Sequence, residues 1–481
     1  MTTPALDGAL HVASRRIDSG PTATVLEPWS GAEVGRVVLA DEARAGEAVN
    51  ASLQAFERLK ARSSYERKAV LLAIVREIEG RRDAFADVIA RESGKPITAA
   101  RTEVARGIST FEIAAEESTR LLGETMPLDI TASTTGYSGS WTRVPAGPVL
   151  AFAPFNFPLN LVAHKLAPAL ACGCPVVLKP PPQTPFTSLL LAECIRKAGA
   201  PADAVQVLPC DIAVAEKLVR DDRFATFSFT GSAKVGWFLK GIAGRKRVLL
   251  ELGGNAAVLV HDDAALDDAS ARIVAGAFGY AGQVCIKVQR LYVHRDIADR
   301  FVGGLVDRTA SLEWQPRSPL DDKALLSSMI DEGAAKRVEQ WVAEAKAAGA
   351  RVLCGGKREG NRFWPTILEI DGAGRGLKVV EEEIFGPVLT VHRYDGWDGA
   401  LDMADGTRYG LQAGVFTDSR ARIAEAYARL HVGGLVVNDV PTFRVDSMPY
   451  GGVKDSGLGR EGVRFAIEEM TERKLMVVRG G

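Results

Sequence analysis

Cys285, which ends a Gly-Gln-Val-Cys run, is the side chain in this sequence best suited to covalent chemistry. A thiol attacks as its thiolate, and with an ordinary pKa of about 8.5 only a small fraction is ionised at neutral pH. Glu251 lies 34 residues earlier, at the start of a Glu-Leu-Gly-Gly run, and offers a carboxylate that can deprotonate water. The pair therefore predicts a thiol nucleophile served by a separate carboxylate.

No histidine lies near either residue in the sequence, and none falls in a Gly-rich or Pro-rich motif. A papain-type Cys/His pair is therefore not favoured. The histidines are His11, His164, His261, His294, His392 and His431.

The composition excludes several classes of protein. The 481 residues are too many for one hydrophobic core, so two or three domains are expected at roughly 150 residues each. Lys and Arg number 59 against 60 Asp and Glu, with no block of like charge that would form a nucleic-acid arm or a polybasic anchor. Residues 1–20 lack the apolar core of a signal peptide, and no stretch reaches the roughly 18 apolar residues of a membrane span. We expect a cytoplasmic protein that binds small molecules and copies of itself, not nucleic acid or a membrane.

The cysteines are spread over a long charged chain, so disulfides are not expected. Cys172 and Cys174 flank one glycine but lack a second pair of ligands, and no metal site is expected there. Chemistry at a cysteine is therefore sought at Cys285.

Two kinds of pattern divide the chain. After a polar leader, apolar residues at three-to-four spacing predict helices over 43–60, 65–91 and 98–122. Short apolar or β-branched runs then alternate with helical stretches, which indicates parallel, doubly wound sheets. We therefore predict an α/β fold with two such domains. The predicted strands are 147–152, 175–178, 205–208, 225–229 and 248–252, followed by 289–293, 388–392, 414–416 and 434–437.

Two further segments have the character of edge strands. Residues 131–143 are rich in Thr, Ser and Gly yet alternate, and 474–478 form another strand-like run. We expect them either to project and pair with another subunit or to form a solvated hairpin.

Three glycine- or lysine-containing motifs bear on cofactor binding. The Gly-x-Gly-x-x-Gly match at 457–462 fails as a dinucleotide site, because neither a preceding strand nor a suitably spaced acidic residue accompanies it. At 229–236 an apolar strand ends in Gly231-Ser232 and opens a helix, whose free N–H groups can face a pyrophosphate. Lys179 ends a predicted strand at the sheet edge where such folds bind ligands. The alternatives are a plain helix N-cap and a surface lysine.

Asn156 follows another predicted strand, between aromatic residues and prolines. An asparagine held in this way can donate its amide N–H to an oxyanion, a contribution of roughly 2.7–4 kcal/mol to catalysis. The alternative is an asparagine that merely shapes a turn.

The order and spacing of these motifs closely resemble the aldehyde dehydrogenase superfamily over nearly the whole chain. The motifs are Pro-Phe-Asn-Phe-Pro at 154–158, Leu-Lys-Pro-Pro at 178–181, Phe-Thr-Gly-Ser at 229–232, Glu-Leu-Gly-Gly at 251–254, Gly-Gln-Val-Cys at 282–285, Glu-Glu-Ile-Phe-Gly-Pro at 382–387 and Pro-Tyr-Gly-Gly-Val-Lys at 449–454. The resemblance implies an NAD(P)-binding domain at 1–128 and 146–251, a catalytic domain at 252–455, and an oligomerisation domain at 129–145 and 465–481. It also implies a homodimer or homotetramer.

The resemblance assigns a role to each matching residue. Cys285 is the nucleophile, Asn156 and the Cys285 backbone N–H form the oxyanion hole, and Glu251 is the general base. The thiolate adds to an aldehyde, the resulting oxyanion expels a hydride to the nicotinamide, and water activated by Glu251 hydrolyses the thioester. Glu461 aligns with a glutamate proposed to pass protons, and a structural ion pair with an arginine is its alternative. The cofactor-binding residues are Phe155, Lys179, Gly231, Ser232, Val235, Glu383 and Phe385.

The cofactor preference depends on the position three residues after Lys179. Many NAD-preferring members have a glutamate there that binds the adenosine ribose, whereas this chain has Pro182. Without that carboxylate NADP is admissible, yet no adjacent arginine rewards it. We expect NAD to be used and NADP to be tolerated. Cys210 stands near a position where relatives often have glycine in a loop by the cofactor, and the sequence does not indicate its effect.

The segment 437–450 resembles the lactaldehyde dehydrogenase branch, close to non-phosphorylating glyceraldehyde-3-phosphate and phosphonoacetaldehyde dehydrogenases. Arg444 in this segment, and Arg106 before the projecting strands, are candidates to bind a carboxylate or phosphonate, because arginine offers a bidentate fork. Surface salt bridges are the alternative for both. Phosphate-handling members often have an arginine just before the cysteine, where this chain has Val284. Short hydroxyaldehydes or semialdehydes are therefore favoured over phosphorylated ones.

Three other functions compete with oxidation to a free acid. A coenzyme A-acylating semialdehyde dehydrogenase shares the fold, but such relatives commonly lack a base at the position of Glu251. Oxidation of phosphonoacetaldehyde or glyceraldehyde 3-phosphate is the second alternative. A non-catalytic structural protein is the third, and the intact set of Asn156, Glu251 and Cys285 argues against it.

Overall fold

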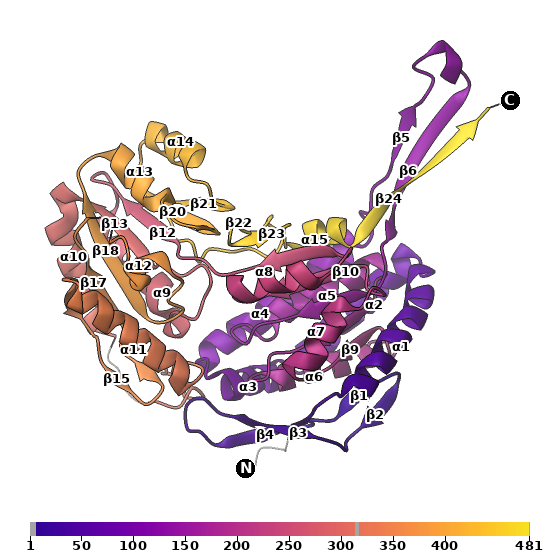
Figure 1. The fold of residues 1–481 in the computed structure, drawn as a ribbon, viewed down its shortest axis with the longest axis horizontal. Coiled ribbons are helices and arrows are strands. Elements are labelled where there is room, and N and C mark those ends of the chain that lie inside the picture. The colour runs from indigo at the N-terminus through magenta and orange to yellow at the C-terminus, as the bar shows by residue number, and fades with distance from the viewer. Residues whose placement is uncertain (1–5, 313–316, 373, 481) are drawn as a thin grey trace.

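The computed structural model describes residues 6–312, 317–372 and 374–480. Two lobes built on separate sheets lie side by side, and a narrow sheet projects from one of them (Figure 1). The first lobe has the strand order β23-β11-β10-β7-β8-β9, in which β23 is the antiparallel edge. Its strands are β7 (Val149–Phe152), β8 (Val176–Lys179), β9 (Val205–Val207), β10 (Thr226–Thr230), β11 (Arg247–Glu251) and β23 (Gly457–Leu458).

Alternate residues of this sheet face two different layers of helices. Val149 and Leu178 pack into one core, whereas Leu150 and Val177 pack into the other. The sheet is therefore doubly wound, as predicted. The first layer contains α2 (Ser64–Glu79), α3 (Arg82–Ser93), α4 (Ile97–Glu117), α5 (Asn160–Cys172), α6 (Pro185–Lys197) and α15 (Val463–Glu469), and the second contains α1 (Glu42–Lys60), α7 (Ile212–Arg220) and α8 (Ala233–Ile242).

Two expectations for the N-terminal region were wrong. The single helix predicted over 65–91 is two helices, because α2 ends at Glu79 before Gly80, a residue with low helix propensity, and α3 begins at Arg82. The segment expected to be a polar leader contains four strands. They are short and bury few residues, such as Leu10 and Val12, so their alternation is hard to recognise in the sequence. These strands are β1 (Leu10–Val12), β2 (Arg15–Ile17), β3 (Thr22–Leu26) and β4 (Glu33–Val38), paired as β1-β2 and β3-β4.

The second lobe is a sheet of order β14-β17-β18-β13-β12-β20-β21, again with helices on both faces. Val258 and Val260 pack against α9 (Leu266–Phe278) and α10 (Arg295–Ala310), whereas Ala257 and Leu259 pack against α13 (Trp397–Asp405) and α14 (Arg420–Arg429). The central strand β12 was not predicted, since so short an apolar run has no distinguishing periodicity. The strands are β12 (Ala257–Val260), β13 (Arg290–His294), β14 (Arg351–Cys354), β17 (Thr366–Glu369), β18 (Val388–Tyr394), β20 (Gln412–Phe416) and β21 (Gly434–Val437).

Smaller elements complete this lobe. Helices α11 (Glu332–Ala347) and α12 (Lys378–Glu381) enclose a further core with the start of β18. Two short antiparallel pairs are β15 (Arg358–Glu359) with β16 (Arg362–Phe363), and β19 (Tyr409–Gly410) with β22 (Val453–Lys454).

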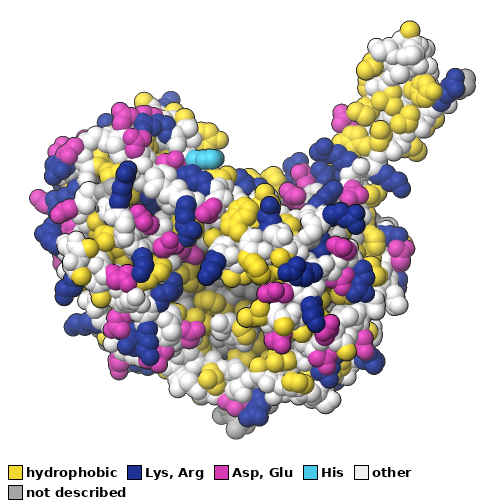
Figure 2. Space-filling model, viewed as in Figure 1, with side chains coloured by type: hydrophobic (Ala, Val, Ile, Leu, Met, Phe, Trp, Pro, Cys, Tyr) yellow, Lys and Arg dark blue, Asp and Glu magenta, His cyan; other side chains and the backbone are white. Residues whose placement is uncertain are grey.

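The projecting sheet joins the middle of the chain to its C-terminal part. Its order is β24-β6-β5, with β5 (Glu124–Pro127), β6 (Tyr137–Pro145) and β24 (Thr471–Arg479), and β24 runs antiparallel along β6 from Thr471 opposite Pro145 to Arg479 opposite Tyr137. The two edge strands expected from the sequence thus pair with each other. Four apolar side chains of β24 are exposed: Leu475, Met476, Val477 and Val478. Figure 2 shows apolar surface along this sheet.

Among the described residues, no helix combines the length and apolar character needed to cross a bilayer. On the face shown in Figure 2, acidic and basic side chains are interspersed.

Candidate active site

The predicted catalytic residues converge on one cavity of about 330 Å³ between the two lobes. Asn156 and Glu251 reach it from the first lobe, and Cys285 reaches it from the second. Other predicted residues that line it are Phe155, Gly231, Ser232, Glu383, Phe385, Arg444 and Glu461.

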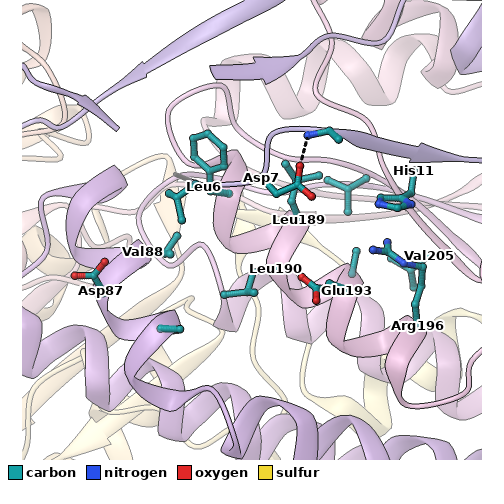
Figure 3. Close-up of a pocket in the computed structure, with 15 residues that line it drawn as sticks. Leu6, Asp7, His11, Asp87, Val88, Leu189, Leu190, Glu193, Arg196 and Val205 are labelled. Carbon is teal, nitrogen blue, oxygen red and sulfur yellow. Dashed lines mark hydrogen bonds between the residues drawn. The ribbon is translucent and has the colours of Figure 1, made fainter. Parts of the chain in front are cut away.

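A separate cavity of about 390 Å³ lies beside α3, α6 and the N-terminal segment (Figure 3). Its walls are largely apolar, with His11 and Arg196 close together at one end and Asp7 accepting from the Ala9 N–H. None of its lining residues, all of which belong to the described chain, is a predicted site residue.

Cys285 is carried by a strained turn between α9 and β13. Tyr280 and Ala281 both adopt left-handed backbone angles, each with a φ of 51°, which residues bearing a Cβ adopt only where packing holds them. A Cβ at Gly282 would lie 2.3 Å from the Gly386 carbonyl oxygen, so the turn is pressed against the segment that precedes β18. The backbone therefore fixes the position of the thiol.

The electrostatic surroundings of Cys285 disfavour the thiolate in this structure. Burial raises the pKa of the thiol to about 11, and the charges of Glu383 and Glu251 add to the rise. The Tyr450 hydroxyl, 3.2 Å from Sγ, and the Arg444 charge act in the opposite direction. At neutral pH the resting thiol is protonated.

Asn156 is buried directly beside the cysteine turn. Its Nδ2 donates to the Gln283 carbonyl at 2.8 Å. A carboxamide nitrogen has two N–H donors, so the second is available to an oxyanion formed at the thiol. The hydrogen bond to the turn also fixes the donor relative to Cys285.

Glu251 ends β11 and is buried. Its Oε2 is buried without a hydrogen-bond partner in the described part of the chain. Burial, followed by the negative charge of Glu461, raises the pKa of Glu251 well above its ordinary value. Gly451 leaves the room this carboxylate occupies, because a Cβ there would lie 2.8 Å from Oε1.

Glu461 is buried in the same cavity, but it is tightly paired. Its carboxylate accepts from Lys165 at 3.0 Å and from Arg444 at 3.4 Å. Burial alone would raise its pKa, yet Lys165, His164 and Arg444 hold the pKa at about 2. The ion pair expected as the alternative role is therefore present, and it includes a lysine that sequence reasoning missed.

The motif predicted to bind a pyrophosphate lies where α8 begins. Gly231 and Ser232 line the cavity at the N-terminus of α8, where Ser232 makes no side-chain capping hydrogen bond. Thr230 Oγ1 is buried without a hydrogen-bond partner among the described residues. Free helix N–H groups and an unsatisfied hydroxyl suit a pyrophosphate. Val235, also predicted to contact the cofactor, is exposed on α8 and does not line this cavity.

Two further groups fit the rest of a dinucleotide. Lys179 ends β8, and its Nζ donates to the Pro180 carbonyl at 3.3 Å. Glu383 accepts from the Gly254 N–H at 3.1 Å, and burial raises its pKa to about 7. Phe155 and Phe385 pack edge to face, with ring centroids 5.9 Å apart, beside this carboxylate. The region therefore offers a donor at Lys179, an acceptor at Glu383 and an aromatic wall, which suit ribose hydroxyls and a ring.

A second opening reaches the thiol from the opposite side. This cavity, of about 310 Å³, is lined by Arg106, Val284, Cys285 and Arg444. The Arg106 guanidinium is paired with Asp446 at 2.6 Å, so its charge is balanced. The side chain of Arg444 is only 6% exposed, and its Nε has no hydrogen-bond partner among the described residues. Arg444 is thus the better-placed anion ligand of the two.

Sequence reasoning missed Tyr450 and Asp446. Tyr450 belongs to a motif quoted for the resemblance, but only the fold brings its hydroxyl to a cysteine 165 positions away. Asp446 accepts from Asn160 and contacts the ring of His164, which adds to its pairing with Arg106. For Asp446 the sequence offered one signal, an aspartate two positions after Arg444.

The fold and the convergence of these residues fit the class of enzyme expected from the sequence, an NAD(P)-dependent aldehyde dehydrogenase. The family model described as "Aldehyde dehydrogenase family" matches residues 16–476. The chain is 43% identical over 417 residues to a 3-sulfolactaldehyde dehydrogenase of Priestia aryabhattai, covering 86% of this chain and 87% of that protein.

Solved structures agree with this match. Aldehyde dehydrogenase 21 of Physcomitrella patens, in complex with the reaction product succinate, superposes with a TM-score of 0.95 at 41% identity and 99% coverage of both chains. Glyceraldehyde-3-phosphate dehydrogenase GapN of Methanocaldococcus jannaschii, complexed with NADP, gives 0.91 at 36% identity, covering 96% of this chain and 100% of that one. This chain belongs to the aldehyde dehydrogenase family, which confirms the resemblance found in the sequence.

Proposed function

We propose that this enzyme oxidises a short aldehyde bearing a carboxylate or sulfonate to the corresponding acid, with Cys285 as nucleophile and Glu251 as hydrolytic base. The observation that carries the proposal is the position of Arg444. Its guanidinium stacks on the Tyr450 ring, 3.7 Å from the centroid, and the hydroxyl of that ring contacts Cys285. An anion ligand and the nucleophile therefore touch the same side chain.

The charge around Arg444 favours an anionic substrate. Glu461 is shared between Lys165 and Arg444, and the nearby Asp446 is paired with Arg106, so both of these carboxylates have another cation beside them. A guanidinium with an unsatisfied buried N–H gains strongly from a carboxylate or sulfonate oxygen. Because the anion site and the thiol are separated by only one aromatic ring, the substrate must be short.

The relatives support the same class of substrate. A 3-sulfolactaldehyde dehydrogenase and a structure containing succinate both involve small anionic molecules. Val284 lines the substrate side of the thiol and adds no charge for a doubly charged phosphate. Singly charged groups are therefore preferred over phosphorylated ones.

The residues of the chain divide the work of the reaction. Asn156 Nδ2 stabilises the oxyanion that forms when Cys285 adds to the aldehyde, and the turn at Gly282 fixes the attacking atom. A nicotinamide dinucleotide, when bound, supplies the hydride acceptor. Glu251 then takes a proton from water as the water attacks the thioester. Its unpartnered Oε2 leaves an oxygen available for this task, which supports hydrolysis over transfer to coenzyme A.

We further propose that Lys179, Gly231, Ser232 and Glu383 hold the dinucleotide, with NAD used and NADP tolerated. Burial lowers the pKa of Lys179, whose nearby titratable group is Cys210 and not a carboxylate. A 2′-phosphate would therefore meet a lysine without an opposing negative charge. Comparing kcat/KM for NAD and NADP tests this assignment, and a preference of more than about a hundredfold (~2.7 kcal/mol) for either would contradict it.

Paired aldehydes test the substrate class. We would compare succinate semialdehyde with butyraldehyde, and sulfoacetaldehyde with propionaldehyde, in wild type, Arg444→Gln and Arg106→Gln. Each ratio of kcat/KM should favour the anion by roughly 10- to 100-fold in wild type and collapse in Arg444→Gln, since a charge-assisted hydrogen bond contributes about 1.5–3 kcal/mol. Arg106→Gln should change the ratio less. Equal ratios in wild type and Arg444→Gln would overturn the proposal, and the ratio removes general effects on the thiol.

We also propose that the projecting sheet joins copies of the chain into a homodimer or homotetramer. The exposed apolar residues of β24 support this, because soluble proteins rarely leave such a strand uncovered. Sedimentation of wild type against a Leu475→Lys, Val477→Lys variant tests it. A wild type that sediments as a monomer at micromolar concentration would refute it.

A further inference from the structure

The thiol of Cys285 has one hydrogen-bond partner in the described chain, and it is a tyrosine. Sγ and the Tyr450 hydroxyl lie 3.2 Å apart, and both residues are enclosed in the cavity. Thiol enzymes commonly use a histidine for this contact, but the buried histidines here have other partners: His164 contacts Asp446, His261 contacts Tyr394 and His392 contacts the Gly372 carbonyl. The tyrosine therefore occupies the position of the missing partner.

The chemistry of the pair fixes which atom donates once the thiol ionises. A thiolate sulfur has no proton and can only accept a hydrogen bond, whereas a phenol can donate one. Burial and the neighbouring Cys285 charge raise the pKa of Tyr450 well above its ordinary value, so the phenol keeps its proton. When the S–H bond breaks, the sulfur proton leaves to water and an O–H···S⁻ bond replaces the neutral contact. Such charge-assisted bonds are about twice as strong as neutral ones.

Tyr450 is held in this position from two directions. Its N–H donates to the Glu461 carbonyl at 3.0 Å, and the Glu461 N–H donates back at 2.7 Å. The Arg444 guanidinium covers one face of its ring. The hydroxyl therefore reaches Sγ without ordering a mobile side chain, which would otherwise cost rotamer entropy.

We propose that Tyr450 is a positioning residue that orients Cys285 and stabilises its thiolate, in place of a histidine. This inference deepens the proposed function, since it rests on Cys285 being the nucleophile. It does not depend on the identity of the aldehyde. Arg444 would then have two roles. Its guanidinium holds the Tyr450 ring, and its Nε–H, which has no hydrogen-bond partner among the described residues, is left for the substrate.

The test measures the thiol without turnover. We would follow alkylation of Cys285 by iodoacetamide between pH 7.5 and 9.5, without aldehyde or cofactor, and quantify the Cys285 peptide by mass spectrometry. Tyr450→Phe should react about 10- to 100-fold more slowly than wild type at each pH, because loss of the hydrogen bond lowers the thiolate fraction. The control is Tyr394→Phe, which removes a buried hydroxyl that hydrogen-bonds His261 in the core of the second lobe. Cys285 of this variant should be alkylated at the wild-type rate.

The possible outcomes separate the explanations. A rate in Tyr450→Phe equal to wild type would overturn the proposal. A faster rate would also overturn it, because it would mean that the tyrosine merely shields the thiol and that its removal exposes the cysteine. The alkylation rate of Cys285 does not depend on which aldehyde the enzyme oxidises. If the comparison of anionic and neutral aldehydes fails, the substrate proposal falls and the role of Tyr450 is still tested. A Cys285→Ser variant, which lacks the thiol, shows that the measured alkylation occurs at residue 285.

Discussion

Two regions of the active-site cavity, each built around a buried glutamate, contrast sharply. Around Glu251 none of the residues that the structure describes donates a hydrogen bond to Oε2, and burial raises the pKa of the carboxyl well above its usual range. Around Glu461 a lysine and an arginine contact the carboxylate, and its pKa is held at about 2. The same side chain at similar burial therefore exists as a proton-accepting group in one region and as a permanent charge in the other.

The contrast supports our proposal that Glu251, and not Glu461, does the acid–base work. Groups whose environments separate their pKa values take different roles, and a base must be able to change its protonation during turnover. Burial raises the pKa of Glu251 and favours such a change there, whereas Glu461, with a pKa of about 2, stays ionised. We propose Glu461 as a fixed counterion that holds Arg444 and, through its charge, keeps Glu251 basic. A proton relay through Glu461 is not favoured by this arrangement.

Glu92, outside the site, supports the physical reading of this contrast. It is fully buried at the start of α6, where the Phe186 and Thr187 N–H groups and the Thr187 hydroxyl donate to it. Burial raises its pKa to about 8 although these neutral donors oppose the shift. Neutral hydrogen bonds alone do not keep a buried glutamate ionised, whereas the cations beside Glu461 do.

The largest effect should follow from removing the base. Glu251→Gln is expected to reduce steady-state kcat by roughly 10²- to 10⁴-fold, the usual contribution of a positioned base. Turnover under saturating aldehyde and NAD, measured at 340 nm, provides the number. A kcat within threefold of wild type would assign water activation elsewhere.

Breaking the ion pair should act mainly on stability. Glu461→Gln leaves Lys165 buried without its carboxylate, a change that typically costs about 3–5 kcal/mol. Urea unfolding should show this loss, and a Lys165→Met, Glu461→Gln double variant should recover part of it. If Glu461→Gln unfolds like wild type but loses turnover as fully as Glu251→Gln, the assignment of the two roles is wrong.

The pH dependence of turnover should separate the two carboxyls. Because the pKa of Glu251 is raised and the base must be ionised, kcat should rise with pH above the ordinary range of a carboxyl group. Glu461 is ionised throughout that range and should contribute no limb. The Cys285 thiol, whose pKa burial raises to about 11, should add a separate rise around that pH. Glu251→Gln should lose the limb that Glu251 produces and keep the limb of the thiol, and two limbs in this variant would show that a group other than Glu251 produces the first.

The smallest effect concerns Glu92 and folding. Its folded pKa lies above the value of the unfolded chain, so its contribution to stability is complete below about pH 4.5 and is lost as the pH rises towards 8. Glu92→Gln should therefore flatten the decline of unfolding free energy across this window. Urea titrations at pH 5, 6.5 and 8 measure the slope, and parallel slopes in both proteins would contradict the assignment.

The sequence predicts the catalytic centre better than its surroundings, for a physical reason. Glu251, Lys179 and Asn156 follow or end strands, and the ends of parallel strands can be located from short apolar runs. The apolar periodicity continues from α2 into α3, so the sequence predicts one helix, although Gly80 separates the two in the structure. The partners of buried charges were beyond reach, since Lys165 and Glu461 are 296 positions apart and only the folded chain joins them. That pairing decides what Glu461 does.

The most direct test of the division between the two glutamates is to trap the reaction on Cys285. Glu251→Gln and Glu461→Gln would each be mixed with NAD and succinate semialdehyde, quenched within seconds, and analysed by intact mass and peptide mapping. The account predicts a stoichiometric acyl adduct on Cys285 with about one NADH per site in Glu251→Gln, and no accumulation in Glu461→Gln, because only Glu251 serves the attacking water. An adduct that accumulates in Glu461→Gln but not in Glu251→Gln would contradict it.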